Sequence, residues 1–366
     1  MKRVVLVGAG HAHAQVLLDW CTSRPPGAEL WVVSPHALAP YSGMVPGWLA
    51  GHYRYEDICI DFAALAAAAG AHWVGDELVA LDPKQRRLTL GSGRLLEYDL
   101  LSLNVGSTLR PPPSPAVPVL ALRPLGELRL RWDAALATIS RSAAMRPVTV
   151  TAVGGGAAGF EALLAVRQRV RQMQPRSTVH LSLVSTGVEL LPGMAPGAAG
   201  HARRTLASLQ ATVQLGKPFD DALPAATDLM LWATGAESHD WQRACGLAVS
   251  APGWIRIDRH LRSISHPEVY ATGDCAAWEQ PLPKAGVFAV RMGPVLSHNL
   301  RAALGTQAPV PYTPQRRVLS LLATGDRRAI ASWGRWSAEG SWVWRWKDRI
   351  DRGFIERFKV APLAAN

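Results

Sequence analysis

Short runs of apolar, mostly β-branched residues alternate along this chain with longer stretches in which apolar residues recur every three or four positions. The runs at 4–7 and 148–150 are followed by stretches of helical spacing at 12–21 and 160–171. A short apolar run bounded by glycine predicts a buried strand, and the helical spacing predicts a helix with one buried face. Strands that alternate with helices predict an α/β fold with parallel sheets.

The same pattern predicts the remaining elements. Further strands are expected near 29–33, 72–74, 78–81, 87–90, 99–104, 179–184, 211–215, 229–232, 255–258, 269–271, 318–323 and 329–333, and further helices near 60–69, 125–142 and 200–209, with one more ending near 303. Residues 40–53 are too rich in Gly and Pro for a regular element and too apolar for an ordinary surface loop. We expect an irregular loop there, which either packs on a flat cofactor or is buried without touching one.

Two strands open into glycine-rich turns, at 8–10 and at 154–159. Such a turn leaves bare backbone N–H groups at a helix N-terminus, where they bind the pyrophosphate of a dinucleotide. The second turn has the complete fingerprint, whereas the first has His13 where the third glycine is usual. This histidine implies either wider spacing between helix and strand or a ring turned outward. The turns predict two Rossmann-like dinucleotide-binding units.

A third element, Thr272-Gly273-Asp274, follows a short strand far downstream. A carboxylate in this place can hold the ribityl chain of a flavin, so the three elements in this order predict an FAD-binding unit interrupted by an NAD(P)-binding unit. We expect residues 1–115 and 251–310 to form the FAD domain, 116–250 the NAD(P) domain and 311–366 a small C-terminal region. Within this scheme the proline-rich stretch 111–115 suits a crossing between domains.

The second strand of each unit ends at a serine, Ser34 or Ser185, where a carboxylate usually selects the ribose. The choice between NADH and NADPH therefore stays open. His11 and His13 either lie beside the flavin phosphates or serve hydrogen bonding and packing, and we favour the second role because a histidine at a helix N-terminus prefers to be neutral.

The candidate cofactor contacts follow from these motifs. For FAD they are Gly8, Gly10, His11, Ala12, Ser34, Pro40, Tyr41, Met44, Pro46, Val79, Val105, Gly106, Gly273, Asp274, Lys284, Ala285 and Gly286, and for NAD(P)H they are Gly154, Gly156, Gly159, Glu161, Ser185, Thr234 and Gly235. Lys284 is the one candidate catalytic residue, because a positive charge there would tune the flavin as it is reduced. The alternative is a solvent-facing lysine at a helix start. Hydride transfer itself requires no side-chain acid, base or nucleophile.

Composition narrows the class of protein. The 366 residues are 48% hydrophobic and 18% charged, which predicts sizeable buried cores and about two to three units. The four cysteines are scattered, which argues for a reducing compartment and against a redox disulfide or a metal site. Without an apolar stretch of membrane-spanning length or a leader segment, we expect a cytoplasmic protein that can still contact a membrane.

The net charge is +11, and almost all of the excess is arginine. No sequence motif supports nucleic-acid binding. Attraction to anionic lipid or phosphate-bearing cofactors, or a merely arginine-rich surface, explains the charge.

Five tryptophans lie between 333 and 346, and from about 344 apolar residues recur at helical spacing between basic ones. This pattern predicts an amphipathic helix that binds a membrane surface or gates a quinone, or one that packs on its own domain or on a second subunit of a homodimer.

The layout resembles the pyridine nucleotide-disulfide oxidoreductase superfamily, in particular the relatives of type II NADH dehydrogenases and sulfide:quinone oxidoreductases. It most resembles the NADH-dehydrogenase-like flavoproteins associated with or fused to selenophosphate synthase (selenide, water dikinase). Segments 7–13, 40–47, 51–53, 283–287 and 342–348 carry this resemblance.

The resemblance implies non-covalent FAD, reduced by hydride from NAD(P)H, and a small electron acceptor such as a quinone or a chalcogen compound. The catalytic cysteines of the sulfide oxidoreductases have no counterparts, and Arg291 and Met292 stand where related quinone reductases carry glutamines. Two alternatives stay open, a reductase of selenium or sulfur metabolism and a flavin-bearing subunit with a vestigial nicotinamide site.

Overall fold

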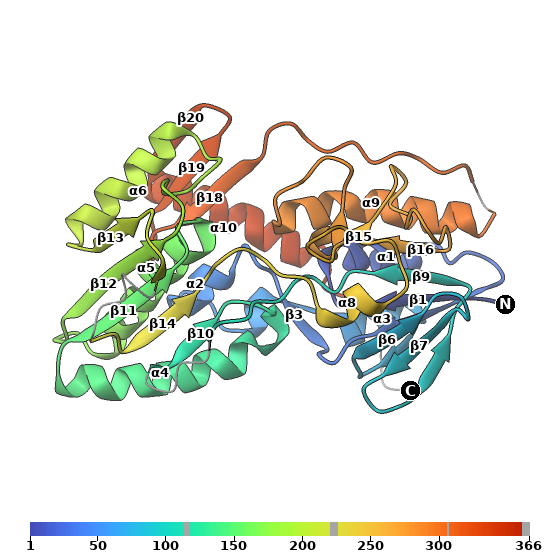
Figure 1. Cartoon of the computed structure of the whole chain (residues 1–366), viewed down its shortest axis with the longest axis horizontal. Coiled ribbons are helices and arrows are strands. Elements are labelled where there is room, and N and C mark those ends of the chain that lie inside the picture. The colour runs from blue at the N-terminus through green and yellow to red at the C-terminus, as the bar shows by residue number, and fades with distance from the viewer. Residues whose placement is uncertain (113–116, 220–225, 306, 361–366) are drawn as a thin grey trace.

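Two parallel five-stranded sheets lie side by side in the computed structural model, which describes residues 1–112, 117–219, 226–305 and 307–360 (Figure 1). The first sheet has the order β16-β9-β1-β2-β5. Its strands are β1 (Lys2–Val7), β2 (Ala28–Val33), β5 (His72–Val74), β9 (Leu100–Leu103) and β16 (Val269–Ala271). Residues 4–6 of β1 are fully buried, as expected for a parallel sheet covered on both faces.

Helices cover this first sheet. Helix α1 (His11–Thr22) packs against both α3 (Phe62–Ala69) and α9 (Gly286–Ala303). Its buried residues include the bulky Trp20. Helix α3 begins at Asp61, whose side chain accepts a hydrogen bond from the Ala64 N–H, and it ends at the left-handed Gly70.

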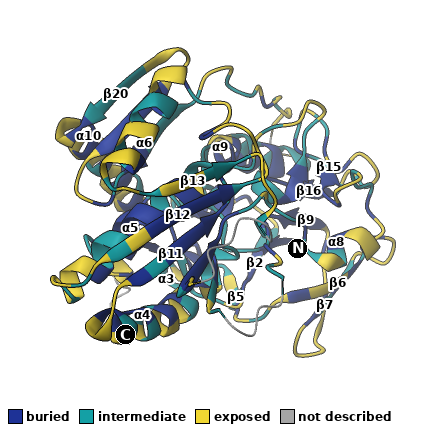
Figure 2. Cartoon of the chain, turned by 60° about the vertical axis from the view of Figure 1, so that its left-hand side comes forward, coloured by how far each residue is buried: buried dark blue, intermediate teal, exposed yellow. Residues whose placement is uncertain are grey.

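The second sheet has the order β10-β14-β11-β12-β13. Its strands are β10 (Val119–Ala121), β11 (Val148–Val153), β12 (Val179–Ser185), β13 (Thr212–Leu215) and β14 (Leu229–Trp232), and its neighbouring helices are α4 (Leu128–Met145), α5 (Ala157–Met173) and α6 (Pro196–Ser208). A short helix α8 (Asp240–Ala244) follows. Figure 2 shows both sheets largely buried, while α4 and α6 expose one face.

The chain enters the first sheet, builds the second sheet and then returns, because β16 pairs with β9 over residues 269–271. The predicted α/β fold with parallel sheets is confirmed. The exact domain boundaries stay a prediction, and residues 113–116 of the expected proline-rich crossing lie outside the described residues.

Smaller sheets join these units. They are β3 (Leu38–Pro40) with β4 (Cys59–Asp61), β6 (Leu78–Asp82) with β7 (Arg87–Leu90) and β8 (Leu95–Glu97), β15 (Ile255–Arg256) with β17 (Ala276–Ala277), and β18 (Leu319–Ala323) with β19 (Ala329–Trp333) and β20 (Trp336–Gly340). Single 3-10 turns are η1 (Glu56–Ile58), η2 (Leu125–Glu127) and η3 (Gly273–Cys275).

The prediction that residues 40–53 hold no regular element was wrong. They contain the end of β3 and the helix α2 (Val45–Leu49). Pro46 lies in the first turn of α2, where a missing N–H costs nothing, and Gly47 lets the Tyr53 ring approach the helix. Glycine and proline therefore allow a short buried helix here rather than prevent one.

Helix α10 (Ser341–Glu356) runs from β20 toward the centre of the molecule (Figure 1). It buries Val343, Trp344 and Ile355, whereas Trp342 and Trp346 are exposed. The amphipathic helix expected from about residue 344 is thus present. Among the described residues, no helix combines the length and the apolar character that crossing a membrane requires.

Candidate functional site

The first glycine turn is held by Asn104, a residue that sequence reasoning missed. Gly8 has a φ of +97°, and a Cβ there would lie 2.5 Å from the Asn104 carbonyl oxygen. A Cβ on Gly10 would lie 2.0 Å from the Asn104 side-chain oxygen, which accepts a hydrogen bond from the Ala12 N–H at 3.1 Å. The Asn104 amide donates to the Thr272 carbonyl at 2.8 Å. Asn104 therefore ties the ends of three segments together.

The two histidines of this turn are neutral. His13 is fully buried, and its Nδ1 donates to the Gly8 carbonyl at 2.7 Å while its Nε2 accepts from the Ser102 hydroxyl at 2.8 Å. Burial lowers its pKa to about 4. Of the two alternatives expected for His13, the outward-turned ring is wrong because both ring nitrogens find partners inside. Burial likewise lowers the pKa of His11 to about 4.

Asp274 lies beside two polar side chains. Its carboxylate accepts a hydrogen bond from the Ser107 hydroxyl at 3.1 Å and forms an ion pair with Arg123. Arg123 also donates to the Lys284 carbonyl at 3.3 Å. Sequence reasoning missed Arg123, which lies between β10 of the second sheet and the turn η2.

Lys284 is partly buried, and its ammonium is directed at the protein. Its ammonium donates to the Ala276 carbonyl at 2.6 Å and lies 4.1 Å from the centre of the Trp254 ring. Burial lowers the pKa of Lys284. The alternative of a solvent-facing lysine is therefore wrong, while its tuning role stays a prediction. Ala285 precedes α9 without a side-chain cap, so the first N–H groups of α9 lack side-chain acceptors.

The segment 40–46 lies beside this helix start. A Cβ on Gly286 would lie 2.6 Å from the Ser42 hydroxyl. The Tyr41 ring lies 5.4 Å from the His11 ring and 4.4 Å from the Phe354 ring of α10, measured between centroids. Met44, which follows Tyr41 closely along the chain, is buried. The structure thus brings His11, Tyr41 and the α9 start into one region.

These residues fit FAD. His11 Nε2 and Thr272 Oγ1 are buried without hydrogen-bond partners, as expected of groups that await a polar ligand. Neither Gly10 nor Ala285 caps its helix with a side chain, and a Cβ on Gly106 would meet open space. The phosphates of FAD would meet the α1 N-terminus, and Asp274 would hold its ribityl chain.

The remaining FAD candidates are less well placed. Ser34 is buried, and its hydroxyl is engaged with the backbone of His36 in its own turn. Val79 lies exposed on β6, in another sheet, and no ring contact or side-chain hydrogen bond of the described residues joins it to the other candidates. Pro40 ends β3 and Pro46 lies in the first turn of α2, while Val105 and Gly273 follow β9 and β16 by two residues.

The second glycine turn fits a dinucleotide in the same way. Gly154 has a φ of +124°, and a Cβ there would lie 2.2 Å from the Ala233 carbonyl oxygen. A Cβ on Gly159 would lie 2.1 Å from the Gly154 oxygen. A Cβ on Gly156, or on Gly235 beside Thr234, would meet no atom within 4 Å. The Ser185 hydroxyl accepts the Gly187 N–H at 3.1 Å, so that serine is partly occupied by its own turn.

Glu161 was predicted to contact NAD(P)H, but its side chain contacts the C-terminal region instead. Its carboxylate accepts a hydrogen bond from the Ala323 N–H at 2.7 Å, which joins α5 to the C-terminal sheet. Burial raises the pKa of Glu161 to about 7, although the charge of Lys347 opposes the shift. The Lys347 ammonium donates to the Gly43 carbonyl at 2.5 Å and to the Asp351 carboxylate at 2.6 Å.

We call Glu161, Lys347 and Asp351 the buried charge cluster. Lys347 and Asp351 are only 7% exposed, and the cluster joins α5, α10 and the segment before α2. Sequence reasoning missed both α10 members, although their i,i+4 spacing inside a helix was a signal for an ion pair. A carboxyl with a pKa near neutrality beside a buried ion pair can take up and release a proton under physiological conditions.

Comparisons with known proteins agree with this geometry. A model of the pyridine nucleotide-disulphide oxidoreductase family matches residues 2–293. An NADH dehydrogenase-like protein of Mycobacterium tuberculosis is 25% identical over 329 residues, covering 76% of this chain and 73% of that protein. The structure of NDH2 from Plasmodium falciparum in complex with NADH superimposes with a TM-score of 0.78 at 13% identity, covering 98% of this chain and 97% of that one. FAD and NAD(P)H, the cofactors expected from the sequence, are the cofactors of this family.

Other relatives are much longer than this chain. The large subunit of nitrite reductase from Klebsiella oxytoca is 27% identical over 229 residues, which cover 57% of this chain but only 22% of that protein. The matched part therefore makes up about a fifth of that relative.

Proposed function

The chain belongs to the pyridine nucleotide-disulphide oxidoreductase family, and from that premise we propose that it accepts hydride from NAD(P)H on FAD and passes the electrons to a small quinone-like acceptor. The observation that carries the proposal is the pair of uncapped helix starts, at α1 and α5, which follow glycines without room for a Cβ: Gly8 and Gly10 before α1, and Gly154 before α5. Bound FAD would supply the redox chemistry, since it accepts a hydride and releases electrons singly or in pairs.

The residues of the chain would bind, orient and tune. Asp274 and Ser107 hold the ribityl side of the flavin site, and the α1 amides hold its phosphates. The α9 N-terminus and Lys284 provide positive potential where negative charge develops on reduction. The buried charge cluster provides a proton-holding group, Glu161, at the junction that α5 forms with the C-terminal region.

The surface of the C-terminal region supports an acceptor that comes from a membrane. Its exposed large side chains are Trp333, Trp336, Trp342, Trp346 and Ile350. Arg345 and Arg349 lie between them on α10, and both are exposed. Aromatic and basic side chains on one amphipathic helix are typical of binding to an anionic bilayer surface. We therefore propose a peripheral contact of this surface with a membrane; a homodimer contact is the alternative.

A chalcogen acceptor is the second candidate. It rests on the resemblance of segments 40–47 and 342–348 to the flavoproteins associated with selenophosphate synthase, an association that stays a prediction. A vestigial nicotinamide site is the third candidate that the sequence leaves open, and the second glycine turn argues against it because Gly154 and Gly159 leave no room for a Cβ.

The test is the visible spectrum of the purified protein, followed anaerobically during addition of NADH or NADPH. Flavin bands that bleach would support the proposal and identify the donor, whereas bound flavin that stays oxidised with both donors would contradict it. Reoxidation is then timed with a short-chain quinone and with a polysulfide or selenite. Faster reoxidation by the chalcogen compounds would replace the quinone proposal with the second candidate.

A further inference from the structure

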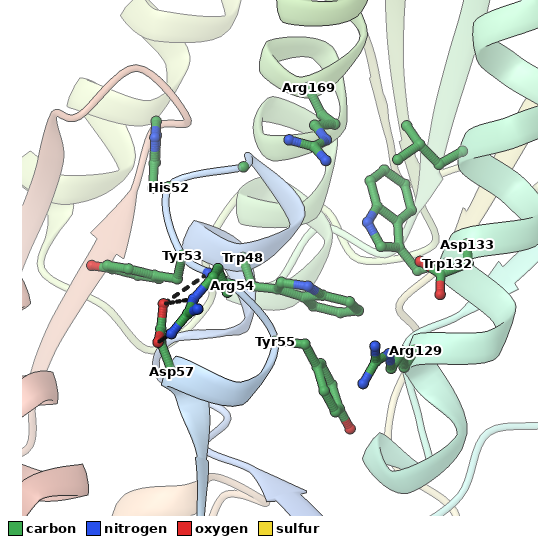
Figure 3. A pocket seen from close by; sticks show the side chains of 12 residues that line it. Trp48, His52, Tyr53, Arg54, Tyr55, Asp57, Arg129, Trp132, Asp133 and Arg169 are labelled. Atoms are coloured by element: carbon green, nitrogen blue, oxygen red, sulfur yellow. Dashed lines mark hydrogen bonds and ion pairs between the residues drawn. The ribbon is translucent and has the colours of Figure 1, made fainter.

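A pocket of about 480 Å³ lies between the segment after α2 and the helices α4 and α5 (Figure 3). This volume is within the range of small-molecule sites in proteins. None of the residues predicted to contact FAD or NAD(P)H lines it. It is therefore separate from both dinucleotide sites, although it lies between the parts of the chain that carry them.

Two tryptophans lie in the lining of the pocket. Trp48 comes from α2 and Trp132 from α4, and they are only 9% and 2% exposed. Figure 3 shows both indoles directed into the space between the elements. The Tyr55 ring packs edge-on against Trp48, with 5.2 Å between the centroids. Rings fixed in this way recognise a planar aromatic ligand by stacking or edge contact.

Arg169 of α5 gives the pocket a positive charge that nothing in the described part of the chain neutralises. Its Nε is buried and has no hydrogen-bond partner, and no ion pair among the described residues includes it. Its guanidinium lies against the backbone of Gly51, where a Cβ would come within 2.3 Å of Nη1. Arg169 as a whole is partly exposed, but a buried guanidinium nitrogen without a partner costs free energy, which a bound anion could recover through charge-assisted hydrogen bonds.

The other charged groups of the lining leave this guanidinium available. Arg54 is paired with Asp57 at 2.9 Å, and Asp133 is exposed on α4. Arg129 lies on the far side of the pocket in Figure 3, 4.7 Å from the centre of the Tyr55 ring, where it also pairs with the exposed Glu56 at 3.1 Å. Arg129 thus adds a guanidinium on the side of the pocket opposite Arg169, and the exposed Glu56 offsets part of its charge.

We propose that this pocket binds a small planar aromatic anion, with its ring against Trp48 and Trp132 and its carboxylate or phosphate on Arg169. The two headgroups share the same recognition chemistry, since both accept paired hydrogen bonds from a guanidinium. The ligand would also touch His52 and Tyr53, which line the pocket. Tyr53 donates to the Asp348 carboxylate at 2.5 Å, and His52 to the Gly325 carbonyl at 2.8 Å, so occupancy is coupled to contacts that hold the C-terminal region.

The test is isothermal titration calorimetry of the FAD-loaded full chain, with NAD⁺ present to fill the nicotinamide site. The probes are 2-naphthoate and 2-naphthyl phosphate, with neutral 2-naphthol as the matched control. We expect saturable one-to-one binding of at least one anion, and the tighter of the two identifies the headgroup. Naphthol should bind at least about tenfold more weakly, because it lacks the charge-assisted hydrogen bonds.

Two variants test the assignment. Arg169→Gln should weaken binding of the better anion about tenfold or more, whereas Arg171→Gln, an exposed arginine on the same helix, should change it less than about twofold. Arg129→Gln should weaken binding of the better anion severalfold. If Arg169→Gln fails to retain FAD, this second variant tests the anion site in its place. No saturable binding, equal binding of naphthol, or unchanged affinity in the Arg169 and Arg129 variants would overturn the proposal.

Discussion

The native protein should become less stable as the pH rises, because Glu161 ionises. The Glu161→Gln variant should not show this decrease. Burial raises the pKa of Glu161 from 4.5 to about 7. Between these values the folded protein keeps a proton that the unfolded chain has already released, so the free energy of unfolding falls as the pH rises from about 4.5 through about 7. Glutamine cannot ionise, and it retains an oxygen that accepts the Ala323 N–H.

The size of the effect follows from the shift. One pKa unit corresponds to about 1.4 kcal/mol, so the shift from 4.5 to about 7 corresponds to roughly 3 kcal/mol. The advantage of the Gln variant over the native protein should therefore grow by up to about 3 kcal/mol between about pH 5 and pH 8. The charge of Lys347 opposes the shift, and its effect is already contained in the value of about 7.

The assay is urea unfolding of the FAD-loaded protein from about pH 5 to pH 8.5, followed by tryptophan fluorescence. Glu189→Gln is the matched control, since Glu189 is exposed on the same unit. Infrared spectra provide a second readout, because a protonated carboxyl that titrates near neutrality should be present in the native protein and absent from the Glu161 variant. Native and variant stabilities that run parallel over the whole pH range would refute the reasoning.

Three further outcomes are expected. Asp274→Ala should lower the ratio of bound flavin to protein after gel filtration severalfold, and a variant that keeps stoichiometric flavin would show that Asp274 is not an anchor. Gly154→Ala should abolish saturable NAD(P)H binding, because its Cβ would lie 2.2 Å from a carbonyl oxygen, whereas Gly353→Ala, with open space around it, should bind normally in the same titration. Replacing Trp342 and Trp346 together by serine should reduce co-flotation with anionic liposomes severalfold, since each exposed indole contributes to interfacial binding. Equal flotation of the double variant, or no flotation of the native protein, would contradict the proposed membrane contact.

The local part of the fold could be predicted from the sequence. The apolar runs at 4–7 and 148–150 and the glycine turns behind them depend on neighbouring residues only, and the structure has strands and helices where they were expected. The strand β20 was missed, because Trp336–Gly340 alternates weakly and its pairing with β19 is set by the left-handed Gly334 at the turn.

The site depends on contacts between residues far apart in the chain, which periodicity does not reveal. Asn104 meets Thr272, and Arg123 meets Asp274, across separations of more than a hundred residues. Lys347 meets the carbonyl of Gly43 in the same way. Each residue alone looks like an ordinary polar side chain, so only the assembled fold shows that they converge on one region.

The pairing of β16 with β9 has a consequence for biosynthesis. Strand β9 is complete at Leu103, but its second neighbour on the sheet ends at Ala271, so the ribosome must make the whole of the second sheet before the edge of β9 is covered. The second sheet, formed from residues 119–232, needs no later segment for its own strand pairing and can form first. Until residue 271 emerges, the nascent chain exposes an apolar strand edge and lacks Asp274, so it is open to edge-to-edge association and cannot yet hold its flavin. We therefore expect the first sheet to close, and the chain to bind FAD, only during the last third of translation.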